Sequence, residues 1–241
     1  MNKLTLTTAA FALLAGSAMA QDVVRMGTEG AYPPYNFIND AGEVDGFERV
    51  LGDELCARAE LTCTWVTNDW DSIIPNLVSG NYDVIMAGMS ITPERDEVID
   101  FSDPYTQPDP SAFVAMTDGI DLTTAVIAAQ TGTIQAGYVA SELPDAALLE
   151  FATPEEAVAA VRNGEADAVL ADKAFLAPIA EAEAELNIMG DDVLIGGGIG
   201  LGLRESDADL KAKFDAAIQS MKADGSLNTL ITDMLPGSAT F

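Results

Sequence analysis

Two polar side chains, Ser90 and Arg95, follow an apolar stretch, residues 84–87, that predicts a buried strand. The carboxyl ends of strands in an open α/β sheet are where such folds present groups to a ligand. A planar guanidinium beside a small hydroxyl is suited to holding a carboxylate through two parallel hydrogen bonds. The alternative is an exposed arginine paired with Glu94 or Asp96, because surface ion pairs are common and weak.

The composition excludes several other kinds of chemistry. The chain has 11 Lys and Arg against 39 Asp and Glu, and a formal net charge of −28, so nucleic acid and anionic lipid are not expected as partners. Histidine is absent and there are 2 cysteines, which removes the usual transition-metal ligand sets and histidine-based acid–base catalysis. We therefore expect no metal site and no cofactor.

Alternating strands and helices are expected to position the polar groups. Apolar residues at three- and four-residue spacing predict helices that follow Asp45, Asn68 and Asp69, and Asp207, with these side chains as N-caps. The predicted strands are residues 23–27, 62–66, 84–87, 112–116 and 126–129. Strands and helices that alternate in units of this size indicate parallel α/β layers.

The chain contains an internal repeat. Residues 77–88, Leu-Val-Ser-Gly-Asn-Tyr-Asp-Val-Ile-Met-Ala-Gly, align without gaps with residues 161–172, Val-Arg-Asn-Gly-Glu-Ala-Asp-Ala-Val-Leu-Ala-Asp. Each copy predicts a helix that ends at a glycine and a strand that ends at a polar loop. Unless the match is a coincidence, Gly88 and Asp172 lie at equivalent strand ends of two similar lobes.

Two segments are candidates for the connections between such lobes. Residues 104–110 contain three prolines and favour an extended crossing. Residues 193–203 are rich in glycine, which tolerates the backbone changes of a hinge, and they are expected to lead back to the first lobe.

The N-terminal residues are typical of a secretory signal. Lys3 supplies a positive charge, residues 4–15 an apolar stretch, and residues 18–20, Ala-Met-Ala, a cleavage site, so the mature chain is expected to begin at Gln21. The apolar stretch is shorter than the about 20 residues that span a bilayer. We therefore expect a periplasmic protein with no direct membrane insertion.

Cys56 and Cys63 fall near the end of a predicted helix and in the strand after it. In an exported protein, a disulfide that joins this helix to this strand is favoured. Two buried free thiols are the alternative.

Several motifs, in their order along the chain, resemble the extracytoplasmic amino-acid-binding proteins of ABC importers, the family of lysine/arginine/ornithine, histidine and opine binders. The most specific pair is Ser-Ile-Thr-x-x-Arg followed by Phe-Ser-x-Pro-Tyr. The resemblance rests on residues 27–35, 46–47, 83–95, 100–105, 130–133 and 168–172. It implies an α/β fold of the two-lobed periplasmic-binding-protein type (type II), in which each lobe is a mainly parallel sheet flanked by helices and two hinge crossings join the lobes.

The resemblance also implies domain boundaries. The signal peptide is expected at residues 1–20, the first lobe at 21–110 plus 199–241, and the second lobe at 111–198.

The resemblance assigns roles in holding the backbone groups of an amino acid. Arg95 matches the arginine that holds the ligand α-carboxylate, and Ser90 and Thr133 match positions that join it from the two lobes, Thr133 near a helix N-terminus. Asp172 matches the carboxylate that receives the α-ammonium. Without the resemblance, Asp172 could equally be a solvated loop acid.

Other matched positions are expected to contact the ligand side chain. Glu29 matches an acid that faces a cationic group, and Tyr32 and Trp70 match the walls that can sandwich a guanidinium or a long aliphatic stem. Gln135 is also expected in the site. As isolated aromatics, Tyr32 and Trp70 could instead be partly buried core residues.

Three positions depart from the pattern of basic-amino-acid binders. Glu29 replaces an aspartate and reaches one methylene further. Ala87 and Gly88 replace hydroxyl residues and leave room for a bulkier ligand, including an N-substituted amino acid. Gly88 is therefore our candidate for the residue that decides which ligand fits.

The resemblance implies a function in transport and not in catalysis. We expect a monomer that captures a basic amino acid (arginine, lysine, ornithine or histidine) or an opine-like derivative and delivers it to an ABC importer permease. The alternatives are an enzyme similar to the periplasmic cyclohexadienyl dehydratases and a ligand sensor for a membrane receptor.

Overall fold

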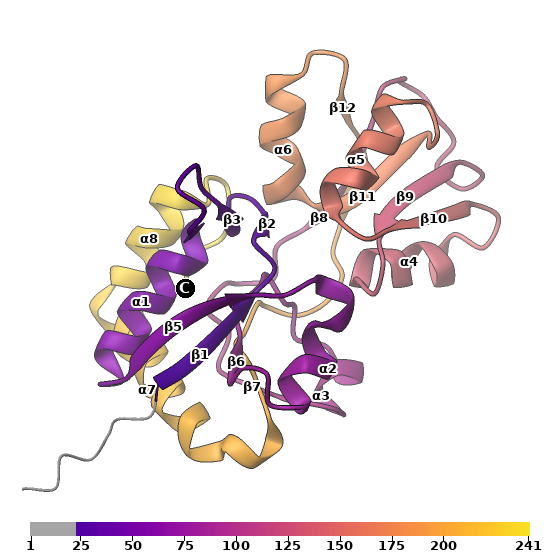
Figure 1. The fold of residues 1–241 in the computed structure, drawn as a ribbon. Coiled ribbons are helices and arrows are strands. Elements are labelled where there is room, and N and C mark those ends of the chain that lie inside the picture. Colours follow the sequence, from indigo (N-terminus) through magenta and orange to yellow (C-terminus); the bar gives the residue numbers. More distant parts are fainter. Residues whose placement is uncertain (1–22) are drawn as a thin grey trace, which may run out of the picture.

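The computed structural model describes residues 23–241, so the expected signal peptide and its cleavage site lie outside the described residues. The chain forms two lobes, each built on a five-stranded sheet with helices packed against it (Figure 1). The first-lobe sheet consists of β5 (Thr62–Thr67), β1 (Val23–Thr28), β6 (Val84–Ile85), β13 (Gly202–Leu203) and β7 (Asp100–Phe101), in this spatial order. The second-lobe sheet consists of β10 (Ala147–Phe151), β9 (Val126–Gln130), β11 (Ala168–Asp172), β8 (Ser111–Ala115) and β12 (Asn187–Val193).

The expected two-lobed α/β fold is confirmed, and both sheets are mixed. In each sheet three neighbouring strands are parallel, β5, β1 and β6 in the first and β10, β9 and β11 in the second. The fourth strand, β13 in the first sheet and β8 in the second, runs antiparallel to these three. The outer strand, β7 or β12, pairs antiparallel with that fourth strand. The reason is the connectivity: β8 and β13 are the first strands reached after the chain crosses between the lobes, and each enters its sheet against the direction of the three parallel strands.

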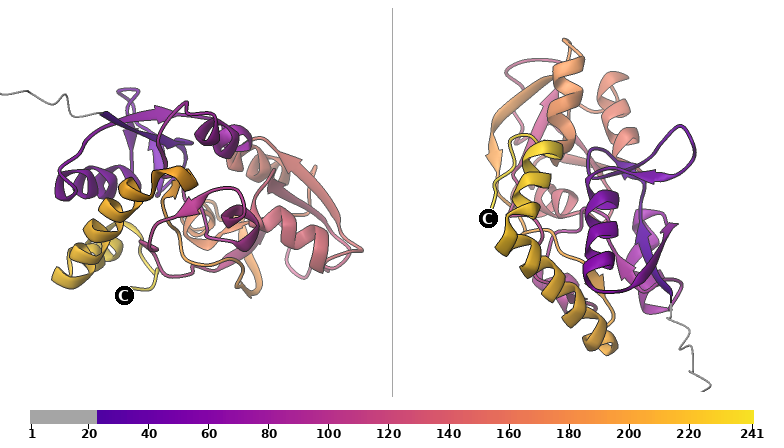
Figure 2. Two further views of the ribbon diagram at one scale, coloured as in Figure 1. Left: turned by 90° about the horizontal axis from the view of Figure 1, so that it is seen from below. Right: turned by 90° about the vertical axis from the view of Figure 1, so that its left-hand side faces the viewer.

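The helices cover the sheets and return the chain end to the first lobe. The first-lobe helices are α1 (Phe47–Arg58), α2 (Ile73–Val78), α3 (Pro93–Asp96), α7 (Ala208–Asp224) and α8 (Ser226–Met234), and the second-lobe helices are α4 (Ile134–Glu142), α5 (Pro154–Arg162) and α6 (Lys173–Ala182). Both α7 and α8 lie beside α1 (Figure 2), as the expected return crossing requires. No helix within residues 23–241 has the length and the apolar run needed to cross a membrane.

Several expected local features are wrong. Asp45 does not cap α1, because the N-cap is Gly46 and an Asp45 carboxylate oxygen accepts the Gly46 N–H. Asp207 makes no capping hydrogen bond at α7. The Asn68 amide donates to Asp69 and Ser72 instead of capping a helix, and a short 3-10 turn, η1 (Trp70–Ser72), precedes α2.

Two other expectations need correction. The apolar spacing after Asp45 places Val50 on one helix face with Leu51 and Leu55, but Val50 is 44% exposed, whereas Leu51 and Leu55 are fully buried. The strand expected at residues 84–87 ends at Ile85, because the backbone bends toward Gly88, which has a φ of +62°.

The internal repeat corresponds to equivalent structure in the two lobes. Gly80 and Gly164 both end a helix with positive φ. The Asp83 carboxylate accepts the backbone N–H of Arg25 at 3.0 Å, and the Asp167 carboxylate accepts that of Val126 at 2.8 Å. Strands β6 and β11 are therefore tied to β1 and β9 in the same way, and the sequence match is not a coincidence.

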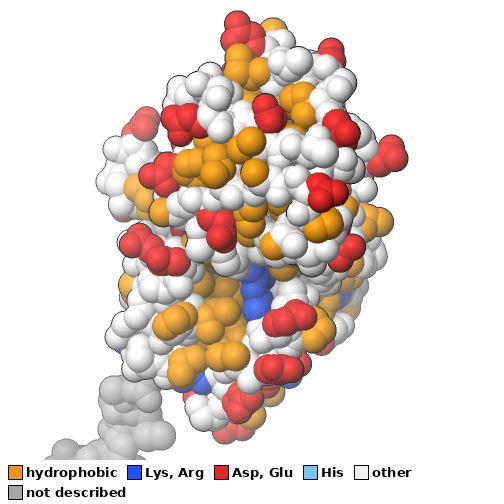
Figure 3. Space-filling model, turned by 90° about the vertical axis from the view of Figure 1, so that its right-hand side faces the viewer, with side chains coloured by type: hydrophobic (Ala, Val, Ile, Leu, Met, Phe, Trp, Pro, Cys, Tyr) orange, Lys and Arg blue, Asp and Glu red, His pale blue; other side chains and the backbone are white. Residues whose placement is uncertain are grey.

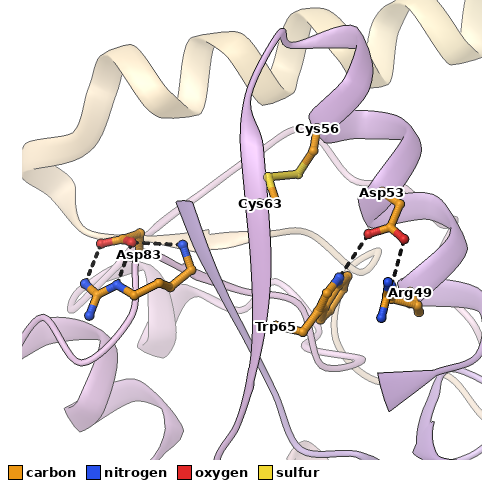
Figure 4. The surroundings of a disulfide bond; sticks show 7 residues. Arg49, Asp53, Cys56, Cys63, Trp65 and Asp83 are labelled. Atoms are coloured by element: carbon orange, nitrogen blue, oxygen red, sulfur yellow. Dashed lines mark hydrogen bonds and ion pairs between the residues drawn. A yellow bond between two sulfur atoms is a disulfide. The ribbon is translucent and has the colours of Figure 1, made fainter. Parts of the chain in front are cut away.

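The disulfide between Cys56 and Cys63 is present and joins α1 to β5 (Figure 4). The Cα atoms of the two cysteines are 6.2 Å apart, within the ordinary range for such a bond. Nearby, the Trp65 indole N–H and the Arg49 guanidinium both donate to Asp53, at 3.0 and 2.7 Å. The disulfide and the Asp53–Trp65 hydrogen bond therefore both hold α1 on β5.

Candidate ligand-binding site

All ten residues expected to bind a ligand line one cavity between the lobes. From the first lobe come Glu29, Tyr32, Trp70, Ala87, Gly88, Ser90 and Arg95, and from the second lobe Thr133, Gln135 and Asp172. Gln130 and Ile134 also line the cavity, and neither was predicted from the sequence as a ligand-binding residue. The structure brings the ten residues together, and their roles in binding stay predictions.

The local structure places Arg95 at the edge of the cavity. Thr92 caps the short helix α3 by accepting the Arg95 backbone N–H, and Pro93 occupies the first helical position, where its missing N–H costs nothing. The Arg95 guanidinium donates to the Ser90 carbonyl at 2.8 Å and lies over the Trp70 ring, 5.3 Å from the centroid. Cation–π contact and the carbonyl hold the guanidinium plane in a fixed orientation.

Burial in the cleft lowers the pKa of Arg95 to about 10, with Asp172 acting in the opposite direction. The guanidinium therefore remains cationic at neutral pH. Arg95 also donates to the Gly132 carbonyl of the second lobe at 3.3 Å. The group suited to an anion thus sits between the two lobes, and Figure 3 shows Lys or Arg atoms at the seam between them while acids are scattered over both.

Asp172 is held from both lobes. It is the last residue of β11, and its carboxylate accepts the Tyr32 hydroxyl at 2.8 Å from the first lobe and the Gln135 amide at 2.8 Å from α4. Tyr32 in turn stacks on Phe175, with ring centroids 4.6 Å apart. Burial raises the pKa of Asp172 to about 6, and the Tyr32 hydrogen bond counters part of that rise. A ligand ammonium placed here would stabilise the ionised carboxylate.

Glu29 follows β1 and faces Gln130, the last residue of β9. The Gln130 amide donates to the Glu29 carboxylate at 2.6 Å across the cleft. Burial raises the pKa of Glu29 to about 7, against the effect of this hydrogen bond. At neutral pH the carboxylate therefore lies near its own midpoint and would be ionised by a neighbouring cation.

Gln130 could have been found by extending the repeat. The equivalence of Arg25 with Val126, defined by their hydrogen bonds to Asp83 and Asp167, makes Glu29 and Gln130 equivalent four residues later. Equivalent strand ends of the two lobes therefore meet across the cavity.

Thr133 uses its side-chain hydroxyl within the second lobe. Its hydroxyl donates to the Gln130 carbonyl at 2.7 Å and accepts the Ala136 N–H at 3.2 Å as the N-cap of α4. With the hydroxyl engaged in the cap, the helix N-terminus and its backbone amides are what this residue can offer an anion.

The cavity has a volume of about 30 Å³, enough for about two water molecules. It is this small because side chains of the two lobes bond directly across it, as the Glu29–Gln130 and Tyr32–Asp172 pairs do. The two lobes are therefore closed on one another. Among residues 23–241 no group of three or more potential metal ligands is found.

Comparison with known proteins gives consistent similarities. The pattern of the bacterial extracellular solute-binding proteins, family 3, matches residues 24–235. The octopine-binding periplasmic protein of Rhizobium meliloti is 32% identical over 92% of this chain and 93% of its own length. The L-arginine-binding protein of Pseudomonas aeruginosa is 32% identical over 93% of each chain.

A crystal structure shows a closer similarity. It is that of a periplasmic His/Glu/Gln/Arg/opine family-binding protein from Silicibacter pomeroyi in complex with lysine. This protein is 68% identical, covers 90% of the present chain and 100% of its own, and superposes with a TM-score of 0.88.

Proposed function

The chain belongs to the bacterial extracellular solute-binding proteins of family 3, and on this premise we propose that it captures a basic amino acid by closing its cleft and delivers it to an ABC importer. The arginine-binding and octopine-binding relatives and the lysine complex of the relative from Silicibacter pomeroyi support this ligand class. An opine-like derivative of a basic amino acid belongs to the same class.

The observation that carries the proposal is the charge of the closed cavity. Glu29 and Asp172 contribute two negative charges and Arg95 one positive charge, so the ionised site is negative by one. Lysine, arginine and ornithine each carry a net charge of plus one and would make the closed site neutral. A neutral amino acid would leave one buried carboxylate without a counter-ion, which is costly in a desolvated site.

Each carboxylate of the site accepts a hydrogen bond from an uncharged group, and a cationic group of the ligand can replace that donor. The α-ammonium would take the place of the Tyr32 hydroxyl on Asp172, and the cationic side chain that of the Gln130 amide on Glu29. The α-carboxylate would meet the Arg95 guanidinium and the N-terminus of α4. The acceptor of each of these bonds is already ionised, and a cationic donor adds the attraction of opposite charges in a desolvated site, so the exchange is favourable.

Capture requires the lobes to open and close. A cavity of about 30 Å³ cannot admit an amino acid unless the lobes part. The ligand groups then contact residues of both lobes only in the closed state, and this differential contact shifts the population toward closure. We place the hinge crossings at the boundaries between residues 110 and 111 and between residues 198 and 199, so that residues 111–198 move as the second lobe.

The remaining assignments follow from the family. We propose a monomeric periplasmic protein, exported through the signal at residues 1–20, whose partner is an ABC permease. We assign it no catalytic residue, because Glu29 and Asp172, the two carboxylates of the cavity, are both used in charge pairing with the ligand. A cyclohexadienyl dehydratase activity would be detected as formation of phenylpyruvate from prephenate or of phenylalanine from arogenate.

A thermal-shift panel on the mature protein tests the proposed function. Lysine, arginine, ornithine, histidine and octopine should be compared with glutamine and glutamate. Mass action raises the melting temperature for true ligands, by an amount that grows with ligand concentration. A rise for glutamine or glutamate, with none for any basic amino acid or octopine, would overturn the proposal.

A further inference from the structure

A buried carboxylate lies behind the candidate site and takes no part in lining it. Glu48 is the second residue of α1 and is 0% exposed. Burial raises its pKa, while hydrogen bonds from Tyr105, Gly88 and Asn36 act in the opposite direction. A charged side chain with no access to water is costly unless its oxygens are satisfied, so the identity of these donors is informative.

The two carboxylate oxygens of Glu48 serve two different walls of the site. One oxygen accepts the backbone N–H of Gly88 at 2.7 Å and also the Tyr105 hydroxyl. The other accepts the Asn36 side-chain amide at 2.7 Å. The Asn36 side-chain oxygen in turn accepts the backbone N–H of Gly30 at 2.7 Å. Glu48 is therefore bonded directly to one cavity loop and through one residue to the other.

The sheet does not control the spacing of these two loops. Strands β1 and β6 pair only at Met26–Val84 and Gly27–Ile85, and beyond Ile85 one backbone bond joins the Met86 N–H to the Gly27 carbonyl. The loop that carries Glu29 and the loop that carries Gly88 both lie beyond this pairing. The Glu48–Asn36 chain bridges them at the point where the sheet stops.

Every link of this chain has a fixed direction. The Gly30 N–H requires an acceptor from Asn36, so the NH₂ group of Asn36 must face Glu48. Glu48 then meets donors on both oxygens, from Asn36 on one side and from Gly88 and Tyr105 on the other. A carboxylate satisfies all of them, whereas an amide has one oxygen and one NH₂ group and cannot.

We propose that Glu48 is a positioning residue of the ligand site, which sets the spacing of the loops at Glu29–Gly30 and at Gly88 through its bonds to Asn36 and Gly88. The inference rests on the proposed function, because it assigns Glu48 a share in ligand affinity without contact with the ligand. Glu29 faces the ligand side chain in that function, so a displaced loop at Gly30 weakens binding at this end of the site first.

A paired substitution tests the direction of the chain. In Glu48→Gln the new NH₂ group faces either the Asn36 amide or the Gly88 N–H, and two donors oppose one another. In Asn36→Asp two buried carboxylates oppose one another. In the double variant Glu48→Gln/Asn36→Asp the amide at position 48 donates to the carboxylate at position 36, and the Gly30, Gly88 and Tyr105 donors all keep an acceptor.

Calorimetry with lysine measures the effect on binding. Each single variant should bind about tenfold more weakly, because the ligand must restore a displaced loop at a cost of about 1.4 kcal/mol. The double variant should return to within about threefold of the native protein. Ile218→Ala is the control, since Ile218 is buried under α7 and does not line the cavity, so its removal should lower the melting temperature without changing the affinity.

Hydrogen exchange supplies a readout that does not depend on a ligand. The Gly30 and Gly88 backbone N–H groups should exchange at least tenfold faster in Glu48→Gln and recover in the double variant. Native affinity for lysine in both single variants, unchanged exchange at the two glycines, or no recovery in the double variant would overturn the proposal. If the native protein bound no basic amino acid while the exchange pattern held, the proposed function would fail and the positioning of the loops by Glu48 would stand.

Discussion

The substitution Glu29→Gln should change the preference of the site between cationic and neutral ligands. Glu29 and Gln have the same length, so the substitution removes the charge and keeps the shape. In the native protein, burial in the closed cleft disfavours the ionised form of the Glu29 carboxylate, and a ligand cation compensates for this cost. With glutamine as ligand, no cation faces Glu29 and the cost of burial is not recovered.

The magnitude follows from the environment of Glu29. Burial raises the pKa from 4.5 to about 7, which corresponds to about 3 kcal/mol. At pH 8 the variant should therefore bind glutamine up to about 100-fold more tightly than the native protein does. It should bind lysine about 100-fold or more weakly, because breaking a buried ion pair costs about 3–5 kcal/mol.

Calorimetric titration of both proteins with lysine and glutamine at pH 8 measures the four affinities. Asp69→Asn is the matched control. Asp69 also raises the pKa of Glu29 but is exposed, so its removal should change each affinity by a few-fold at most. Equal changes in lysine and glutamine affinity on Glu29→Gln would refute the reasoning, because a general disturbance of the site affects both ligands alike.

Three further predictions follow from the same site and its scaffold. In the native protein the affinity for glutamine should rise by about tenfold per pH unit as pH falls from about 7 toward 4.5, because the pKa of Glu29 is about 7 in the closed complex and ordinary in the open protein, so closure takes up a proton. The affinity for lysine should stay nearly constant. Calorimetry at pH 5 and 8 that gave the same trend for both ligands would contradict this prediction. Arg95→Ala should weaken lysine binding by about 2–5 kcal/mol, because the ligand carboxylate loses its counter-ion in a desolvated site; unchanged affinity on titration would exclude the carboxylate role. Cys56→Ser/Cys63→Ser should lower the free energy of unfolding by about 2–3 kcal/mol, because an eight-residue loop is no longer closed, and leave the lysine affinity unchanged; a loss of affinity in folded protein would show that the disulfide supports the site.

Two strand ends of the candidate site could be predicted because the sequence marks them twice, whereas most of the individual site residues came from the family resemblance. Residues 84–87 and 168–171 are apolar runs followed by polar loops, and their match identifies Gly88 and Asp172 as equivalent points. The physical cause is the shared pair of carboxylates, Asp83 and Asp167, each of which bonds to the backbone of the neighbouring parallel strand. A feature repeated for a structural reason is visible in the sequence.

The features that were missed depend on partners distant in the sequence. Glu48 shares the buried face of α1 with Leu51 and Leu55, where an acid is not expected, and its partners Asn36, Gly88 and Tyr105 enclose it. The N-cap expected at Asp45 failed for a local reason. Asp45 accepts from Gly46 beside it, so a polar residue before a helix was available for other bonds.

The measurement that tests the central claim most directly is a crystal structure of the lysine complex. The account predicts lysine between the lobes with its α-carboxylate on Arg95, its α-ammonium on Asp172 in place of the Tyr32 hydroxyl, and its side-chain ammonium within about 4 Å of Glu29. Lysine bound outside the cleft, or bound within it with the side chain directed away from Glu29, would contradict the account.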